Sequence, residues 1–222
     1  MTKKEAGWGL VYLLLQLLVL PSVLIQANQL LAQPLSNTEL NLVFFLVNFL
    51  AILAIFRRFL WISLRHGLQR SFPCLKTAFV GFAVYQLSSV LLSMVIMKID
   101  PLFANVNDAS IALLAQEHFT LMALATVFLV PVVEETLFRG LIFHWLYNRS
   151  RTLAFIFSTV LFCTIHVVGY IGEFPPLTLL LCFVQYIPAG LCLGWAYAKS
   201  GTIWVPIIIH ITVNQIAIFA VR

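Results

Sequence analysis

Seven long runs of apolar residues, separated by short polar or proline-containing breaks, make up most of this 222-residue chain. A bilayer core of about 30 Å is crossed by about 20 helical residues, and each run is close to that length. The breaks carry turn-forming residues, such as Pro34 before Ser36 and Asp100 before Pro101. The pattern therefore predicts an all-α polytopic membrane helical bundle of about seven transmembrane helices, near residues 8–31, 40–56, 77–97, 119–147, 153–170, 177–197 and 202–221.

The composition narrows the class of protein further. Hydrophobic residues make up 62% of the chain and charged residues 9%, whereas a soluble domain is about half apolar and about a quarter charged. This balance excludes a disordered chain and an ordinary water-soluble enzyme. The run at 8–31 exceeds the apolar part of a cleavable signal peptide, about 7–15 residues, so we expect a retained helix. Because no repeat or separate polar segment interrupts the pattern, we expect one integral membrane domain over residues 1–222.

Positively charged residues gather in alternate breaks between the predicted helices. With the N-terminus in the cytoplasm, only Lys98 and Arg222 fall on the outer side. The basic residues that then fall on the inner side are Lys3, Lys4, Arg57, Arg58, Arg65, Arg70, Lys76, Arg149, Arg151 and Lys199. The positive-inside rule therefore predicts a cytoplasmic N-terminus. Because these residues form no compact basic face, we expect membrane lipid and no nucleic acid as a partner; the sequence does not indicate an oligomeric state.

Several polar residues fall inside predicted membrane helices, where an ionisable group costs about 2.5–3.5 kcal/mol and points to function. They are Glu134, Glu135, Arg139, His166, His210 and Asn214. At about 1.5 Å per residue, Glu134 and His166 lie about 20 Å from the cytoplasmic ends of their helices, His210 about 12 Å and Asn214 about 18 Å. Because three helices bring polar groups to a similar depth, we predict that these groups form one site.

The spacing of the charged residues separates their roles. Glu135 and Arg139 stand four residues apart, so they share a helix face and can form an ion pair. Glu134 is turned by about 100° from Glu135 and is left to face a cavity. The alternative interpretations are structural: Glu134 as a second acceptor for Arg139, His166 as a core histidine bonded to a carbonyl, and Asn214 as a link between packed helices.

Two local features predict how the helices bend and pack. Pro131 cannot donate a backbone hydrogen bond and suits a first helical turn, so we expect a break or kink that sets Glu134 and Glu135 near a helix N-terminus. Gly190 and Gly194, four residues apart, predict close approach of helix 177–197 to a neighbour.

The candidate residues supply the chemistry of amide hydrolysis. A carboxylate can take a proton from water as a general base, and imidazole and amide N–H groups can stabilise the oxyanion that develops on the scissile carbonyl. The sequence contains no GxSxG motif and no evident Ser-Lys or Cys-His pair, so a nucleophilic mechanism is disfavoured. The four cysteines form no CxxC pair, and we expect neither a disulfide framework nor a structural metal.

Three motifs in this order resemble those of a known family. Glu134-Glu135 with Arg139 matches EExxxR, Phe162 with His166 matches FxxxH, and His210 with Asn214 matches HxxxN. The chain resembles the CPBP family of intramembrane proteases, the CAAX-processing and bacteriocin-processing or Abi family, over about residues 119–217. The resemblance implies an endopeptidase acting on a membrane-associated or lipidated peptide or protein in a bacterial plasma membrane.

The resemblance also implies a role for each matched residue. Glu134 would activate water, His166 would assist that water, and His210 and Asn214 would be oxyanion donors. Glu135, Arg139 and Phe162 would be supporting residues.

Two alternatives remain open at this point. The family has also been described as metalloproteases, and zinc would be held by Glu134, His166 and His210. We prefer a reaction without a cofactor because the HExxH arrangement is absent, while zinc stays the alternative. The second alternative is a non-catalytic bacteriocin immunity protein, membrane scaffold or transporter that uses the same polar cluster.

Overall fold

The computed structural model describes residues 1–220, and it is helical almost throughout. Arg222, assigned above to the outer side, and the end of the helix predicted at 202–221 lie outside the described residues. The elements are α1 Lys3–Leu18, α2 Leu20–Gln29, α3 Asn37–Gln69, α4 Ser71–Ile99, α5 Val106–Glu117, α6 Phe119–Leu124, η1 Ala125–Leu129, α7 Val130–Glu135, η2 Thr136–Phe143, α8 His144–Tyr147, α9 Arg151–Ile165, η3 Val168–Tyr170, α10 Pro176–Gln185, α11 Ile187–Ser200 and α12 Trp204–Ala220.

Within residues 1–220, five helical segments are long and apolar enough to cross a membrane. They are Asn37–Gln69, Ser71–Ile99, Phe119–Tyr147, Arg151–Tyr170 and Pro176–Ser200. A sixth is obtained if α1 and α2, bent by 49° at their junction, form one broken span. The polytopic helical bundle is therefore confirmed, and the chain is an integral membrane protein. The count of about seven is not confirmed, because α12, described over 17 residues to Ala220, is a shorter apolar helix than these five.

The segment between the second and third predicted helices differs most from expectation. The helix predicted at 40–56 continues to Gln69, and a local distortion at Phe56 (φ −104°, ψ 15°) interrupts it without ending it. At this distortion the N–H of Phe59 donates to the carboxylate of Glu5 at 2.8 Å, which joins α1 to α3. A single residue, Arg70, then separates α3 from α4, so the predicted polar break is a tight corner.

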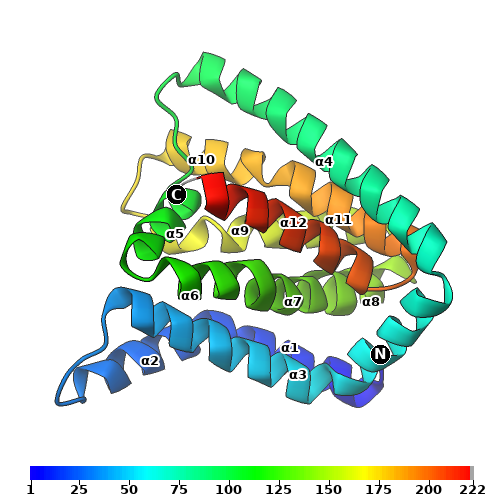
Figure 1. Cartoon of the computed structure of the whole chain (residues 1–222), viewed down its shortest axis with the longest axis horizontal. Coiled ribbons are helices and arrows are strands. Elements are labelled where there is room, and N and C mark those ends of the chain that lie inside the picture. Colours follow the sequence, from blue (N-terminus) through cyan, green and yellow to red (C-terminus); the bar gives the residue numbers. More distant parts are fainter. Residues whose placement is uncertain (221–222) are drawn as a thin grey trace.

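The segment Phe119–Tyr147 is the central helix of the bundle (Figure 1). In its most apolar stretch 67% of the residues are buried inside the protein, against 11–33% for the other four spans. Helices α3, α9 and α12 pack against it from different sides. The outward residues of the surrounding helices are large and apolar, as a lipid environment requires.

The central helix does not break at Pro131, because Phe119–Tyr147 forms one helical segment, so the expected break is wrong. A π-helical turn, η1, immediately precedes the proline, and the N–H of Val130 donates to the carbonyl of Ala125. A second π-helical segment, η2, follows Glu135 directly. The two glutamates therefore lie within a continuous helix and not at a helix N-terminus. Single π-type turns inside α-helices are frequent at functional sites.

The predicted close approach at Gly190 is confirmed. A Cβ atom at this position would lie 2.5 Å from Cγ2 of Thr159, which is closer than two carbon atoms can pack. Gly190 therefore lets α11 approach α9. At Gly194 the nearest atom to such a Cβ, on the ring of Phe143, is 3.2 Å away, so the contact there is looser.

Candidate active site

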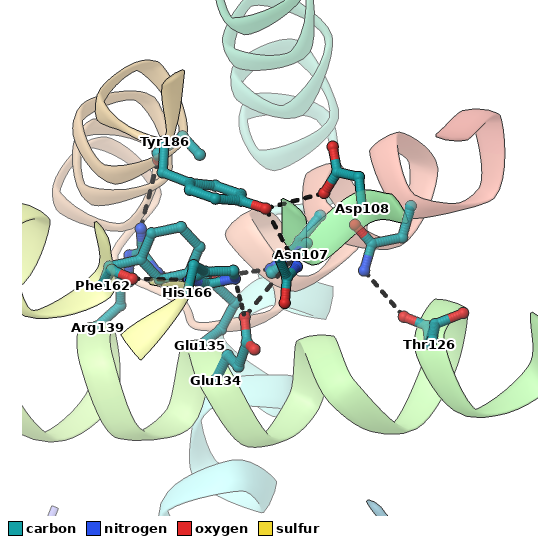
Figure 2. A network of polar contacts seen from close by, with 12 residues as sticks. Asn107, Asp108, Thr126, Glu134, Glu135, Arg139, Phe162, His166 and Tyr186 are labelled. Carbon is teal, nitrogen blue, oxygen red and sulfur yellow. Dashed lines mark hydrogen bonds and ion pairs between the residues drawn. The ribbon is translucent and has the colours of Figure 1, made fainter. Parts of the chain in front are cut away.

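Three side chains from three helices converge on one point near the middle of the bundle (Figure 2). Glu134 comes from α7, His166 follows the end of α9, and His210 lies on α12. The Oε2 atom of Glu134 is 3.9 Å from Nε2 of His166 and 3.9 Å from Nε2 of His210. The structure thus brings together the three side chains that the sequence placed at a similar depth.

The other nitrogen of each imidazole is already engaged. Nδ1 of His166 is 2.7 Å from the carbonyl oxygen of Phe162, and Nδ1 of His210 is 2.9 Å from Oε1 of Glu135. Both oxygens are acceptors, so each Nδ1 carries the hydrogen and donates it. In the neutral imidazoles, Nε2 then presents a lone pair toward Glu134.

The arrangement leaves room for a small hydrogen-bond donor. Oε2 of Glu134 is buried and has no hydrogen-bond partner within residues 1–220. Consider a water oxygen placed about 2.8 Å from Oε2 and from both Nε2 atoms. The angle at this oxygen between Oε2 and either nitrogen would be about 90°. Three acceptors facing one point can therefore hold a water molecule that donates to two of them.

Glu135 and Arg139 form the ion pair that their spacing predicted. Nη1 of Arg139 donates to Oε1 of Glu135 at 3.0 Å, and neither side chain is exposed. The guanidinium also reaches the carbonyls of Ala189 and Gly190 at 3.3 and 3.4 Å. It lies 4.3 Å from the ring centre of Phe162, within cation–π range. This buried pair thus fixes the carboxylate that accepts from the Nδ1–H of His210.

Asn214 lies one turn beyond His210 and lines the same cavity as Glu134. Its amide donates to the carbonyl of Thr126 at 2.9 Å (Figure 2). The N–H of Val130 donates to the carbonyl of Ala125, five residues earlier. In the same register the nitrogen of Pro131 would face the carbonyl of Thr126, but a proline nitrogen carries no hydrogen. Asn214 supplies the donor that the proline lacks, so it joins α12 to the central helix. Its second N–H remains for another acceptor.

The converging residues line a cavity of about 570 Å³. Its deep part includes Glu134, His166 and His210, and its walls are largely apolar, with Phe45, Leu193 and other aliphatic and aromatic side chains. Toward the end of the bundle where α5 lies, polar residues line it, and these are Asn41, Asn107, Asp108, Ser110, Tyr170 and Tyr186. The cavity thus connects the carboxylate of Glu134 to the α5 end of the bundle.

Sequence reasoning missed the polar residues of this outer part. It leaves residues 98–118 between two predicted helices, whereas Asn105 caps α5 by accepting from the N–H groups of Asn107 and Asp108 at 3.0 and 3.2 Å. The signal was present, because Asn followed by an acidic residue and an apolar run is typical of a helix N-terminus. Tyr186 gave no such signal, since an aromatic residue in a membrane helix is ordinarily packing.

The donor types needed for zinc are present around Glu134. Each histidine also gives its second nitrogen to a carboxylate or carbonyl, as zinc-binding histidines do. As arranged, however, residues 1–220 contain no group of three or more His, Cys, Asp or Glu side chains positioned to hold a metal ion. The residues therefore do not fit a metal site in this arrangement.

Comparisons with known proteins match part of this chain. Residues 116–216 match the profile of the family described as "Type II CAAX prenyl endopeptidase Rce1-like". A relative named "Putative membrane peptidase YdiL", from Bacillus subtilis (strain 168), is 29% identical over 99 residues. That match covers 44% of this chain and 36% of the relative. No solved structure matches the chain. The resemblance to the CAAX-processing proteases is thus confirmed over the region that carries all three motifs.

Proposed function

We propose that this protein is an intramembrane endopeptidase in which Glu134 activates a water molecule to hydrolyse a peptide bond. One observation carries the proposal: a buried carboxylate oxygen without a hydrogen-bond partner in residues 1–220 faces two imidazole nitrogens, each 3.9 Å away, in a cavity of about 570 Å³. The similarity of residues 116–216 to the type II CAAX prenyl endopeptidase family supports it.

The proposed reaction begins with the water between Glu134 and His166. The carboxylate of Glu134 takes one proton from the water as its oxygen attacks the scissile carbonyl carbon. The second hydrogen points to Nε2 of His166, which orients the water. Glu134 then gives its proton to the amide nitrogen as the C–N bond breaks, and a carboxylic acid and an amine leave.

His210 and Asn214 are the proposed donors to the oxyanion of the tetrahedral intermediate. His210 gives its Nδ1–H to Glu135, so it can donate from Nε2 only as an imidazolium, whose charge the carboxylate of Glu135 stabilises. In this proposal His210 takes up its extra proton from solvent before the water attacks and keeps it throughout, so the water is then held by Glu134 and His166. Asn214 donates the N–H that is not used by Thr126. Donors of this kind are each worth about 10²–10³ in rate.

The proposed substrate is a membrane-associated or lipidated peptide or protein, because the deep cavity is lined mostly by apolar side chains. We place the protein in a bacterial plasma membrane with its N-terminus in the cytoplasm, where the basic residues contact anionic lipid. In this orientation the cavity faces the outer side of the membrane, since α5 lies at the end of the bundle opposite the N-terminus (Figure 1).

The test compares purified wild type with Glu134→Gln on lipidated and unlipidated fluorogenic peptides. Loss of the general base should lower kcat by about 10²–10⁴-fold. Glu173→Gln is the matched control, because Glu173 is an exposed acid outside the cavity lining. Unchanged thermal unfolding of both variants would establish that they fold. Cleavage that persists in the Glu134→Gln variant would remove Glu134 as the base.

A chelator arm separates the proposed mechanism from the zinc alternative. We expect activity to survive 1,10-phenanthroline and the metal content to stay well below one ion per chain. Activity lost with chelator and restored by zinc would replace the metal-free mechanism. If instead a cellular immunity phenotype survives Glu134→Gln, the protein acts by binding and not by catalysis.

A further inference from the structure

Tyr186, at the junction of α10 and α11, lies between His166 and the start of α5 (Figure 2). Its ring centre is 4.2 Å from that of His166, with the planes tilted by 34°. The ring of Phe162 contacts the same imidazole from another direction, at 4.6 Å between ring centres. The single hydrogen bond from Nδ1 to the Phe162 carbonyl leaves the imidazole free to swing about that bond, and the two rings restrict this motion.

The hydroxyl of Tyr186 is fixed by α5. It donates to Oδ1 of Asp108 at 2.8 Å and accepts from Nδ2 of Asn107 at 3.1 Å. Asn105, the capping residue of α5, donates its own amide to Oε1 of Gln185 at 2.8 Å. The first turn of α5 is therefore tied to the α10–α11 junction through neighbouring residues of both elements.

These contacts link an exposed residue of α5 to the imidazole of His166. Asp108 is exposed, whereas Tyr186 and His166 are partly buried, and all three line the cavity. A shift of the Tyr186 ring would release one side of the imidazole whose Nε2 faces Glu134. A misplacement of about 1 Å in such a group can cost about 10²-fold in rate.

We infer that Tyr186 is a positioning residue for the hydrolysis, holding His166 in its reactive orientation while Asp108 of α5 holds Tyr186. The expected effect on kcat rests on the proposed function. The expected effect on the orientation of His166 rests only on the described contacts. It makes α5 part of the reactive structure, because the first turn of this helix acts on His166 through Tyr186.

The kinetic test uses Tyr186→Phe, which keeps the ring and removes the hydroxyl, and Tyr186→Leu, which removes the ring. We expect kcat to fall about tenfold for Phe and about 100-fold for Leu, with KM within about twofold of wild type. Asp108→Ala should lose less than the Phe variant, because Oδ1 of Asn105, 3.2 Å from the Tyr186 hydroxyl, remains as an acceptor. Asp108→Asn, which keeps an acceptor at position 108 as well, should lose least. Tyr12→Phe is the matched control, because it also removes a tyrosine hydroxyl that is hydrogen-bonded to another helix, to Oδ1 of Asn48 at 2.7 Å, and Tyr12 does not line the cavity.

A second readout does not depend on activity. In a Glu134→Gln background with isotope-labelled histidine, the NMR signals of His166 should shift in both Tyr186 variants and in Asp108→Ala, and not in Tyr12→Phe. If wild type cleaves no peptide, the proposed function fails, and the NMR comparison still decides whether Tyr186 positions His166. Unchanged His166 signals in both Tyr186 variants would overturn the inference. A raised KM with unchanged kcat would also overturn it, because Tyr186 would then be a substrate contact.

Discussion

Replacing Arg139 by Met should destabilise the protein strongly while a second substitution at Glu135 restores it. Arg139 and Glu135 are fully buried and 3.0 Å apart, so Arg139→Met leaves the Glu135 carboxylate in a low-dielectric interior without its guanidinium partner and with only the Nδ1–H of His210 as a donor. Removing one partner of a buried pair costs about 3–5 kcal/mol, whereas replacing both charges is often close to neutral. Loss of the cation–π contact with the Phe162 ring, at 4.3 Å, should increase the loss of unfolding free energy by at most about 2 kcal/mol.

The assay is equilibrium unfolding in mixed micelles for wild type, Arg139→Met, Glu135→Gln and the double variant. The single Arg139→Met should lose about 3–5 kcal/mol, and the double variant should recover most of that loss. Peptidase activity should stay low in the double variant, because the neutral amide that Glu135→Gln introduces can accept from His210 but cannot stabilise an imidazolium. If the double variant is as unstable as Arg139→Met alone, the unpaired carboxylate is not the cause and the reasoning fails.

Three other expectations address packing, the proline turn and orientation. Gly190→Ala should cost about 1–3 kcal/mol of unfolding free energy, and Thr159→Ala in the same chain should restore much of it, since their contact is the obstacle. Asn214→Asp should be as destabilising as Asn214→Ala, about 1–3 kcal/mol, because neither can donate to the buried carbonyl; a stable Asp variant would contradict this. In intact cells, a membrane-impermeant maleimide should label Ser110→Cys at the cavity and reach Arg149→Cys only after permeabilisation; the reverse pattern would invert the orientation.

The sequence alone predicted the features that depend on helical periodicity and on the free-energy cost of placing polar residues in lipid. Long apolar runs required membrane helices, and the i, i+4 spacing of Glu135 and Arg139 placed them on one face, where they pair. Glu134, His166 and His210 were costly in a bilayer, and the rise of a helix put them at one depth, where they meet. Such inferences need only the geometry of a single helix.

What depends on neighbouring helices required the tertiary structure. The sequence could not show that Pro131 is absorbed by a π-turn, because that turn is stabilised by the bond from Asn214 to Thr126, which stand 88 residues apart along the chain. It could not show that Asn105, Asp108 and Tyr186 meet, since their contacts join segments about 80 residues apart. The local pattern fixes which face of a helix is polar, but only packing selects which partner covers that face, and here it adds α5 to the candidate site.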